Sequence, residues 1–146
     1  MSYPINIAYD TLLYIRTSQH ATHCLDLCFS THLTHTTLTF HALMKHMLAS
    51  HHKHWYTQKQ LSRQILGKHQ LMPIYISKKL ILCPLQSRRA PVQYYINMQQ
   101  VVGMSSHRAH TTIVFINNHR ITIPYPYTVC VKKWKAAQIL MQTLNH

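Results

Sequence analysis

Apolar residues alternate with polar or small residues in three short runs near the start of the chain. The apolar positions are Ile5, Ile7 and Tyr9 in the first run and Leu13 and Ile15 in the second, and the third run spans residues 24–29. A period of two residues is typical of β-strands that bury one face. We therefore predict an N-terminal β region over residues 1–30, folded as a meander.

The apolar spacing changes to a helical period between residues 39 and 66. A single stripe is formed by Phe40, Leu43, Met44, Met47 and Leu48. Thr39 is the expected N-cap of this helix, which we predict to end near His54. A second helix is predicted over residues 57–66, with Thr57 as its cap and Gly67 as the residue that stops it. Residues 39–66 are thus expected to form a helical pair.

Residues 73–123 return to short apolar runs, which predict a β-rich region. The expected strands cover residues 74–76, 80–83, 94–102, 111–116 and 119–123. Pro73 excludes a helix at the first of these strands. The dipeptide Asn117-Asn118 suits a tight hairpin turn between the last two strands, because Asn tolerates a positive φ.

A final helix is predicted over residues 127–144, and its outer face is expected to carry Lys132, Lys133 and Lys135. Strands and helices are segregated along the chain, which favours an α+β fold over a doubly wound sheet. We therefore expect antiparallel β-sheets with about three helices, in a single compact domain of residues 1–146 that binds DNA.

Basic residues far outnumber acidic residues, and the two types are unevenly distributed. The 146-residue chain contains 15 Lys and Arg but two acids, which gives a net charge of +13. Asp10 and Asp26 both precede residue 45, whereas 14 of the basic residues follow residue 44. A surface with this imbalance repels itself unless it binds a polyanion. We therefore predict a nucleic-acid partner in preference to a membrane.

The scarcity of acids and glycines argues against most enzyme classes. Paired-carboxylate hydrolysis and Mg²⁺-dependent phosphoryl transfer require clustered acids, which the two separated aspartates cannot supply. Gly67 and Gly103 are too few for a Gly-rich phosphate loop. No known signature surrounds any of the four cysteines, so a cysteine nucleophile is not expected. We predict a cytoplasmic protein with reduced cysteines, no enzymatic activity and no cofactor.

Two groups of residues have side chains that can bind a metal. One group holds His23, Cys24, Cys28, His32 and His35, and the other holds His46, His51, His52 and His54. On a strand, the first group's cysteines lie about 13 Å apart, which is too far for shared ligation. Histidines at the end of a helix interact favourably with its dipole, which is the preferred interpretation of the second group. A metal-dependent module is therefore only a third hypothesis, and no metal site is predicted.

Nine basic residues are the candidates for contact with DNA. They are Lys59, Arg63, Lys68, Lys78, Lys79, Arg88, Arg89, Arg108 and Arg120. Distributed cations of this kind bind backbone phosphates, and loop arginines such as Arg88 and Arg89 insert into narrow A·T-rich minor grooves. Stacking on unpaired bases is a second use for the nearby aromatic residues Trp55, Tyr56, Tyr75, Tyr94 and Tyr95. An ordinary core or surface role is the preferred interpretation of these aromatic residues.

Four features between about residues 36 and 140 occur in an order that is found in a known family. They are an amphipathic helix before His54-Trp55-Tyr56, a short helix from Gln58-Lys59 to Gly67, a strand start at Met72-Pro73-Ile74, and a hairpin over residues 113–123 followed by a helix with Trp134. In this order the chain resembles the ComK family, the competence transcription factors of Gram-positive bacteria. It departs from the family in having almost no acidic residues.

The resemblance implies a transcriptional activator of DNA-uptake genes. Such a protein binds A·T-rich duplex DNA, largely through the minor groove, as a homodimer or higher oligomer. The resemblance assigns a DNA contact to Lys59 and implies a proteolytic adaptor as a partner, although we expect the family's C-terminal recognition tail to be absent. The alternative hypothesis is an RNA- or ribosome-associated basic binding protein, which the same charge and aromatic residues also favour.

Overall fold

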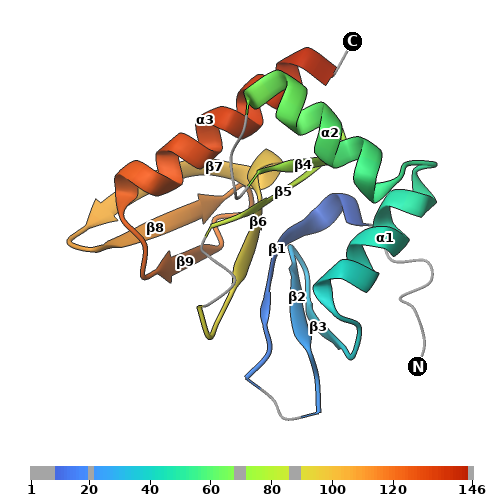
Figure 1. The fold of residues 1–146 in the computed structure, drawn as a ribbon. Coiled ribbons are helices and arrows are strands. Elements are labelled where there is room, and N and C mark those ends of the chain that lie inside the picture. The colour runs from blue at the N-terminus through green and yellow to red at the C-terminus, as the bar shows by residue number, and fades with distance from the viewer. Residues whose placement is uncertain (1–8, 20–21, 68–71, 86–89, 145–146) are drawn as a thin grey trace.

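The computed structural model describes residues 9–19, 22–67, 72–85 and 90–144. Its strands are β1 (Leu12–Thr17), β2 (Leu25–Phe29), β3 (Leu33–Thr36), β4 (Ile74–Ser77), β5 (Leu80–Pro84), β6 (Tyr94–Asn97), β7 (Val101–His107), β8 (His110–Phe115) and β9 (Arg120–Ile123). Its helices are α1 (Phe40–Ser50), α2 (Trp55–Leu66) and α3 (Tyr127–Leu144), with short 3₁₀ turns η1 (Tyr9–Thr11) and η2 (Met98–Gln100). This arrangement confirms the predicted α+β fold (Figure 1).

Two antiparallel sheets organise the described part of the chain. The large sheet has the strand order β3-β2-β1-β6-β5-β4, and the small sheet has the order β7-β8-β9. Strand β1 lies inside the large sheet and is buried on both faces. Leu12 and Ile15 enter one core, whereas Leu13 and Tyr14 enter the other. A bulge between Leu12 and Tyr14 accounts for two adjacent side chains on the same side.

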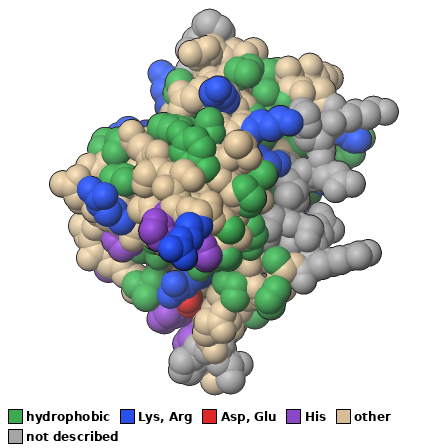
Figure 2. All heavy atoms as spheres, turned by 90° about the vertical axis from the view of Figure 1, so that its left-hand side faces the viewer, with side chains coloured by type: hydrophobic (Ala, Val, Ile, Leu, Met, Phe, Trp, Pro, Cys, Tyr) green, Lys and Arg blue, Asp and Glu red, His purple; other side chains and the backbone are tan. Residues whose placement is uncertain are grey.

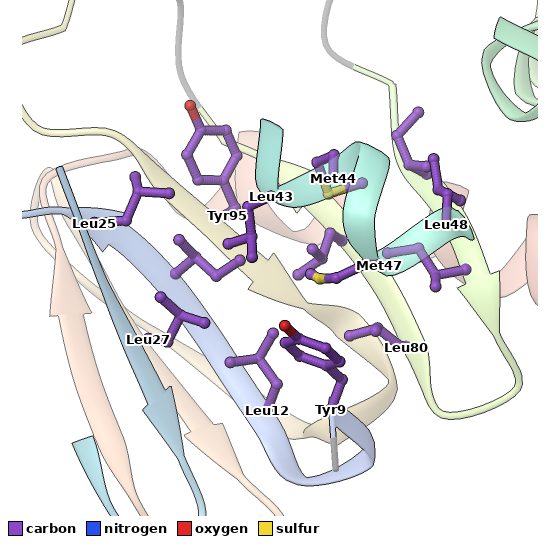
Figure 3. Close-up of a cluster of buried hydrophobic side chains, with 14 of the residues drawn as sticks. Tyr9, Leu12, Leu25, Leu27, Leu43, Met44, Met47, Leu48, Leu80 and Tyr95 are labelled. Atoms are coloured by element: carbon purple, nitrogen blue, oxygen red, sulfur yellow. The ribbon is translucent and has the colours of Figure 1, made fainter. Parts of the chain in front are cut away.

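Helix α1 covers one face of the large sheet. The buried members of its predicted stripe, shown in Figure 3, are Leu43, Met44, Met47 and Leu48. The hydroxyl of Thr39 accepts a hydrogen bond of 3.2 Å from the amide of Ala42, which confirms the predicted N-cap. The helix ends at Ser50, before the predicted end at His54, because the chain turns at His52, where φ is +58°.

The small sheet and helix α3 cover the opposite face of the large sheet. Ile113 and Phe115 of β8 lie in one core cluster with Ala137 and Leu140 of α3. The bounds of α3 agree with the predicted helix over residues 127–144. Strands β8 and β9 confirm the predicted hairpin, and Asn118 takes a φ of +68° in its turn. The layers are therefore α1, the large sheet, and then the small sheet with α3 (Figure 1).

Helix α2 begins earlier than the sequence indicates. Its N-cap is His54, so the prediction that Thr57 caps it is wrong. Trp55 packs partly buried against the α1 core, and this tertiary contact fixes the first residue of the helix. Gly67 ends the helix as predicted, with a φ of +84° and its N–H donated to the carbonyl of Arg63.

The predicted strand over residues 94–102 is instead two strands in different sheets. Strand β6 ends at Asn97, and β7 begins after η2. The buried Asn97 side chain donates to the carbonyls of Leu12 and Lys79, at 2.7 and 2.9 Å. It accepts from the amide of Ile81 at 3.0 Å. These contacts fix the place where the chain leaves the large sheet.

The N-terminal β prediction is confirmed for part of its length. The run over residues 24–29 forms β2, and Leu13 and Ile15 lie in β1. Tyr9 lies in a 3₁₀ turn rather than a strand, while Ile5 and Ile7 lie outside the described residues. Strand β3 is an addition, since its four residues carry one apolar side chain and gave no strand pattern.

Candidate nucleic-acid interface

The predicted contact residues divide into groups by their place in the fold. Lys59 and Arg63 lie on α2, Lys78 and Lys79 lie between β4 and β5, and Arg108 and Arg120 belong to the small sheet. These six side chains are all exposed. Lys68, Arg88 and Arg89 lie outside the described residues.

Helix α2 presents two cations one helical turn apart. Because Lys59 and Arg63 are four residues apart, their side chains leave the same face of the helix. The ammonium of Lys59 also lies 5.5 Å from the centre of the Trp55 ring, a cation–π contact. Gln58 and Ser62 are buried on the other side of the helix. These buried residues fix the rotation of α2 and thereby keep both cations in solvent.

The turn between β4 and β5 holds two further cations on a fixed backbone. The side-chain amide of Asn97 donates to the carbonyl of Lys79 at 2.9 Å, and that of Gln99 donates to the carbonyl of Lys78. Both lysine side chains are exposed. The turn therefore displays two adjacent positive charges whose main-chain positions are set by side-chain hydrogen bonds from Asn97 and Gln99.

The outer face of the small sheet consists of the side chains that point away from the core. Alternate residues of β8 that point inward, Thr111, Ile113 and Phe115, are fully buried. The cross-strand register puts the outward residues in two rows of three, Ser105–Thr112–Thr122 and Gly103–Val114–Arg120, and in the pair His107–His110 beside the hairpin tip. The hydroxyls of Thr112 and Thr122 lie 3.0 Å apart. The two rows of three are therefore built from short side chains, with Arg120 as their long and charged member, and the histidine pair lies between these rows and the tip.

Arg108 occupies the tip of the β7–β8 hairpin. His107 pairs with His110, so Arg108 and Ala109 form a two-residue loop. The φ of Arg108 is +58°, and a positive φ at the first central position of such a loop is usually supplied by Gly. A left-handed backbone costs a residue with a side chain about 1–2 kcal/mol. The tip thus combines an exposed cation with an unfavourable backbone conformation.

The structure does not gather these groups on one surface. In Figure 1, α2 lies beside the upper right end of α3, and the small sheet lies below the left half of α3. Figure 2 views the molecule from the small-sheet side and shows Lys, Arg and His side chains spread over it, with acidic side chains in one small spot. Arg108 and Arg120 therefore belong to one candidate surface, and Lys59 and Arg63 belong to another.

One of the two acids is buried and paired within the large sheet. An Asp26 carboxylate oxygen lies 3.1 Å from Nε of Arg16, and the other lies 2.7 Å from Nδ1 of His35. Burial alone would raise the pKa of Asp26, but hydrogen bonds from His35, Arg16 and Ser18 outweigh burial and lower the pKa. The Asp26 charge is therefore compensated locally, which leaves the exposed basic residues uncompensated by it.

Helix α3 differs from the expectation that all three of its lysines face outward. Lys132 and Lys135 are exposed. Lys133 is partly buried, and this burial lowers its pKa. The prediction is therefore wrong for Lys133, because this position of the helix turns toward the protein rather than toward solvent.

The five aromatic residues considered for base stacking have different environments. Tyr75 and Tyr95 are buried, and Trp55 packs against the α1 core. Tyr56 is 71% exposed, and Tyr94 is partly exposed. Three of the five aromatic residues therefore pack in the protein, in agreement with the preferred interpretation of a core or surface role. The rings of Tyr56 and Tyr94 are accessible to a ligand.

Tyr94 lines an open hollow of about 400 Å³ beside the small sheet. The lining residues are Arg16, Gln19, Pro91, Val92, Tyr94, Pro124 and Tyr125. None of these side chains is a carboxylate, imidazole or thiol. The hollow thus offers aromatic and guanidinium surfaces, which suit stacking and anion binding rather than general acid–base chemistry.

The residues considered as metal ligands do not converge. Cys24 is exposed, whereas Cys28 is buried with its sulfur 4.0 Å from Nε2 of His119. Across the described ranges, no three or more His, Cys, Asp or Glu side chains are placed to hold a metal ion together. Over the same ranges, none of the helices has both the length and the apolar character needed to cross a bilayer.

Comparison with known proteins identifies the family. The family model described as ComK protein matches residues 6–146, nearly the whole chain. No curated protein and no solved structure matches the chain. The family match agrees with the resemblance found in the order of helices, strands and aromatic residues. The chain therefore belongs to the ComK family, a family of competence transcription factors rather than of enzymes.

Proposed function

We propose that this protein regulates transcription by binding A·T-rich duplex DNA through the minor groove and the phosphate backbone. The observation that carries the proposal is the one-sided charge. No acid follows Asp26 in the sequence, and the Asp26 carboxylate is paired with Arg16 and hydrogen-bonded to His35. The exposed cations of α2, of the β4–β5 turn and of the small sheet therefore create a positive field that attracts a polyanion.

We further propose that the DNA contacts are made by the exposed basic residues of all three groups, together with Lys68, Arg88 and Arg89. A duplex bound at the small sheet leaves the cations of α2 for a second DNA segment or for DNA held by a second copy. This division supports binding as a homodimer or higher oligomer, in agreement with the family resemblance. The stoichiometry of the complex is measured by analytical ultracentrifugation with labelled duplex.

The first test is a fluorescence-anisotropy titration at two salt concentrations. The ligands are an A·T-rich duplex, a G·C-rich duplex and a single-stranded RNA of equal length. We expect the A·T-rich duplex to bind tightest, with a plot of log K against log salt that falls by about 0.9 for each phosphate contacted. Equal binding of the two duplexes would contradict the proposal.

A specific observation favours RNA as the second candidate ligand. The hollow beside the small sheet places Tyr94, Tyr125 and Arg16 around one open volume. Aromatic rings next to a guanidinium bind unpaired bases by stacking, which duplex DNA does not offer. Tighter binding of the single-stranded RNA, lost in Tyr94→Ala but retained in Tyr56→Ala, would support this second function over the first.

A further inference from the structure

We propose that Arg108 is the residue that enters the minor groove, and that the outer face of the small sheet lies on the flanking phosphates. This inference rests on the proposed function and assigns its sequence preference to one residue. It concerns a part of the chain that carries no turn or groove-binding motif in its sequence. Three independent features of the structure support it.

The first feature is the shape of the hairpin. Strand β9 pairs with β8 as far as Thr111 opposite Ile123, whereas the β7–β8 ladder continues to His107 opposite His110. The β7–β8 ladder therefore extends one residue pair beyond the third strand, and Arg108 lies in the loop that closes it. The minor groove is about 6 Å wide, which is too narrow for a two-stranded β-ribbon but admits a single extended side chain. We therefore infer that the arginine side chain enters the groove while all three strands stay outside it.

The second feature is the backbone of Arg108. Its φ of +58° places an arginine where a two-residue hairpin loop normally has Gly. Asn is the usual second choice for a positive φ, and both residues would relieve the strain. The two-residue loop requires the positive φ, but no packing contact in the described structure requires an arginine at this exposed position. Such outliers are typical of functional positions.

The third feature is the composition of the outer face. Ordinary solvent-exposed faces mix long side chains of both charges. Here the outer face holds no acid: its two rows contain Gly103, Ser105, Val114 and the hydroxyl pair Thr112–Thr122, with Arg120 as their charged member, and the His107–His110 pair follows toward the tip. Short side chains let the sheet approach a backbone closely, and hydroxyls and guanidinium groups are the donors that bind phosphate oxygens.

These features give Arg108 and Arg120 different roles in DNA binding. The Gly103–Val114–Arg120 row lies four residues from His107 along β7, about 13 Å at the rise of a strand. Arg120 is therefore too far along the face to share the groove with Arg108 and lies over the backbone instead. A narrow A·T-rich groove has an enhanced negative potential that attracts arginine, and the amino group of guanine obstructs the groove of G·C pairs. Arg108 thus supplies preference and Arg120 supplies affinity.

The experiment compares three duplexes of equal length, made of A·T, G·C or inosine·C pairs. Inosine lacks the guanine amino group, so inosine·C resembles A·T in the minor groove and G·C in the major groove. The variants are Arg108→Asn, which suits a positive φ, and Arg120→Gln. Lys45→Gln is the matched control, because Lys45 is exposed on α1, on the opposite side of the large sheet from the small sheet. Circular dichroism confirms that each variant is folded.

We expect the wild-type protein to bind A·T and inosine·C duplexes alike, and both more tightly than G·C. Arg108→Asn should reduce this preference by at least about five-fold. Arg120→Gln should weaken binding to all three duplexes equally and make the salt slope shallower, and Lys45→Gln should change neither quantity. A wild-type preference that Arg108→Asn leaves intact would overturn the inference while keeping the proposed function. A wild-type protein without any preference would instead remove the proposed function itself.

Discussion

The side-chain amide of Gln58 donates a 2.6 Å hydrogen bond to the main-chain carbonyl of Tyr75. One helical turn later, the hydroxyl of Ser62 donates to the carbonyl of Pro73 at 2.7 Å. Strand β4 is an edge of the large sheet, so these carbonyls have no neighbouring strand in the described structure. Helix α2 therefore closes an edge that would otherwise be open to pairing with another chain.

Replacing Gln58 with Ala should lower the free energy of unfolding by about 1–3 kcal/mol, because it removes a buried hydrogen bond between helix α2 and the edge strand. Urea denaturation followed by circular dichroism measures this change. Gln64→Ala is the matched control, since Gln64 lies on the same helix and is exposed. The control should stay within about 0.5 kcal/mol of the wild type. Equal losses in both variants would show that α2 does not depend on this hydrogen bond.

The ion pairs of Asp26 predict a pH-dependent contribution to stability. Hydrogen bonds from His35, Arg16 and Ser18 outweigh burial and lower the pKa of Asp26 in the folded state. A carboxyl with a lowered pKa stabilises the fold above its unfolded pKa of about 3.9, and this contribution is lost as the pH falls through the folded pKa. Asp26→Asn should therefore cost about 1–3 kcal/mol at pH 7.

The difference between wild type and Asp26→Asn should shrink as the pH is lowered below about 4. Urea titrations at pH 7, 5, 4 and 3 measure it. Asp10→Asn removes the same charge from an exposed position in η1 and should give a small difference at every pH. A wild-type advantage that persists undiminished at pH 3 would show that Asp26 contributes through packing rather than through its charge.

Physical causes explain which parts of the fold were predicted correctly from the sequence and which were not. Helix α3 is predictable because an amphipathic pattern follows two prolines and is interrupted at one position, Gln138. The division between β6 and β7 is not, because it depends on Asn97, whose partners Leu12 and Lys79 are distant in sequence. The start of α2 likewise depends on the packing of Trp55 against the α1 core. Local sequence propensities do not predict contacts between residues that are distant in the sequence.

In the candidate site, too, some features can be predicted from the sequence and others depend on the tertiary structure. The sequence identifies Arg108 and Arg120 as exposed cations, but only the strand register puts them in one sheet. The hydroxyl row Ser105–Thr112–Thr122 cannot be recognised in the sequence, since its members belong to three different strands. The positive φ of Arg108 is also hidden, because arginine is not a residue that turn chemistry would place there.

The cysteines are expected to differ sharply in reactivity. Burial raises the pKa of the Cys83 thiol to about 12 and also raises the pKa of Cys28 and of Cys130. Because the thiolate is the nucleophile, these three thiols should react slowly in the folded protein, whereas Cys24 is exposed. Iodoacetamide at pH 8 should add one group quickly, as intact-mass spectrometry measures. Cys24→Ser should abolish the fast reaction, and fast labelling of Cys83 would contradict the burial seen here.

Arg108→Gly should stabilise the protein while it weakens DNA binding. Glycine relieves about 1–2 kcal/mol of left-handed strain but adds flexibility to the unfolded chain, so a net gain of about 0.5–1 kcal/mol is expected. Ala109→Gly is the matched control in the same loop. Ala109 is not among the described residues with a positive φ, so this change should destabilise the fold slightly.

Urea denaturation measures the stability of both variants, and anisotropy with the A·T-rich duplex measures their binding. Opposite effects of Arg108→Gly on the two quantities would mean that the arginine is kept at the tip for its charge, against the preference of the backbone. A stabilised Arg108→Gly variant that binds DNA as tightly as the wild type would instead make Arg108 an unfavourable turn residue without a role in binding. Ala109→Gly should leave binding unchanged, because it alters neither the charge nor the position of the hairpin strands.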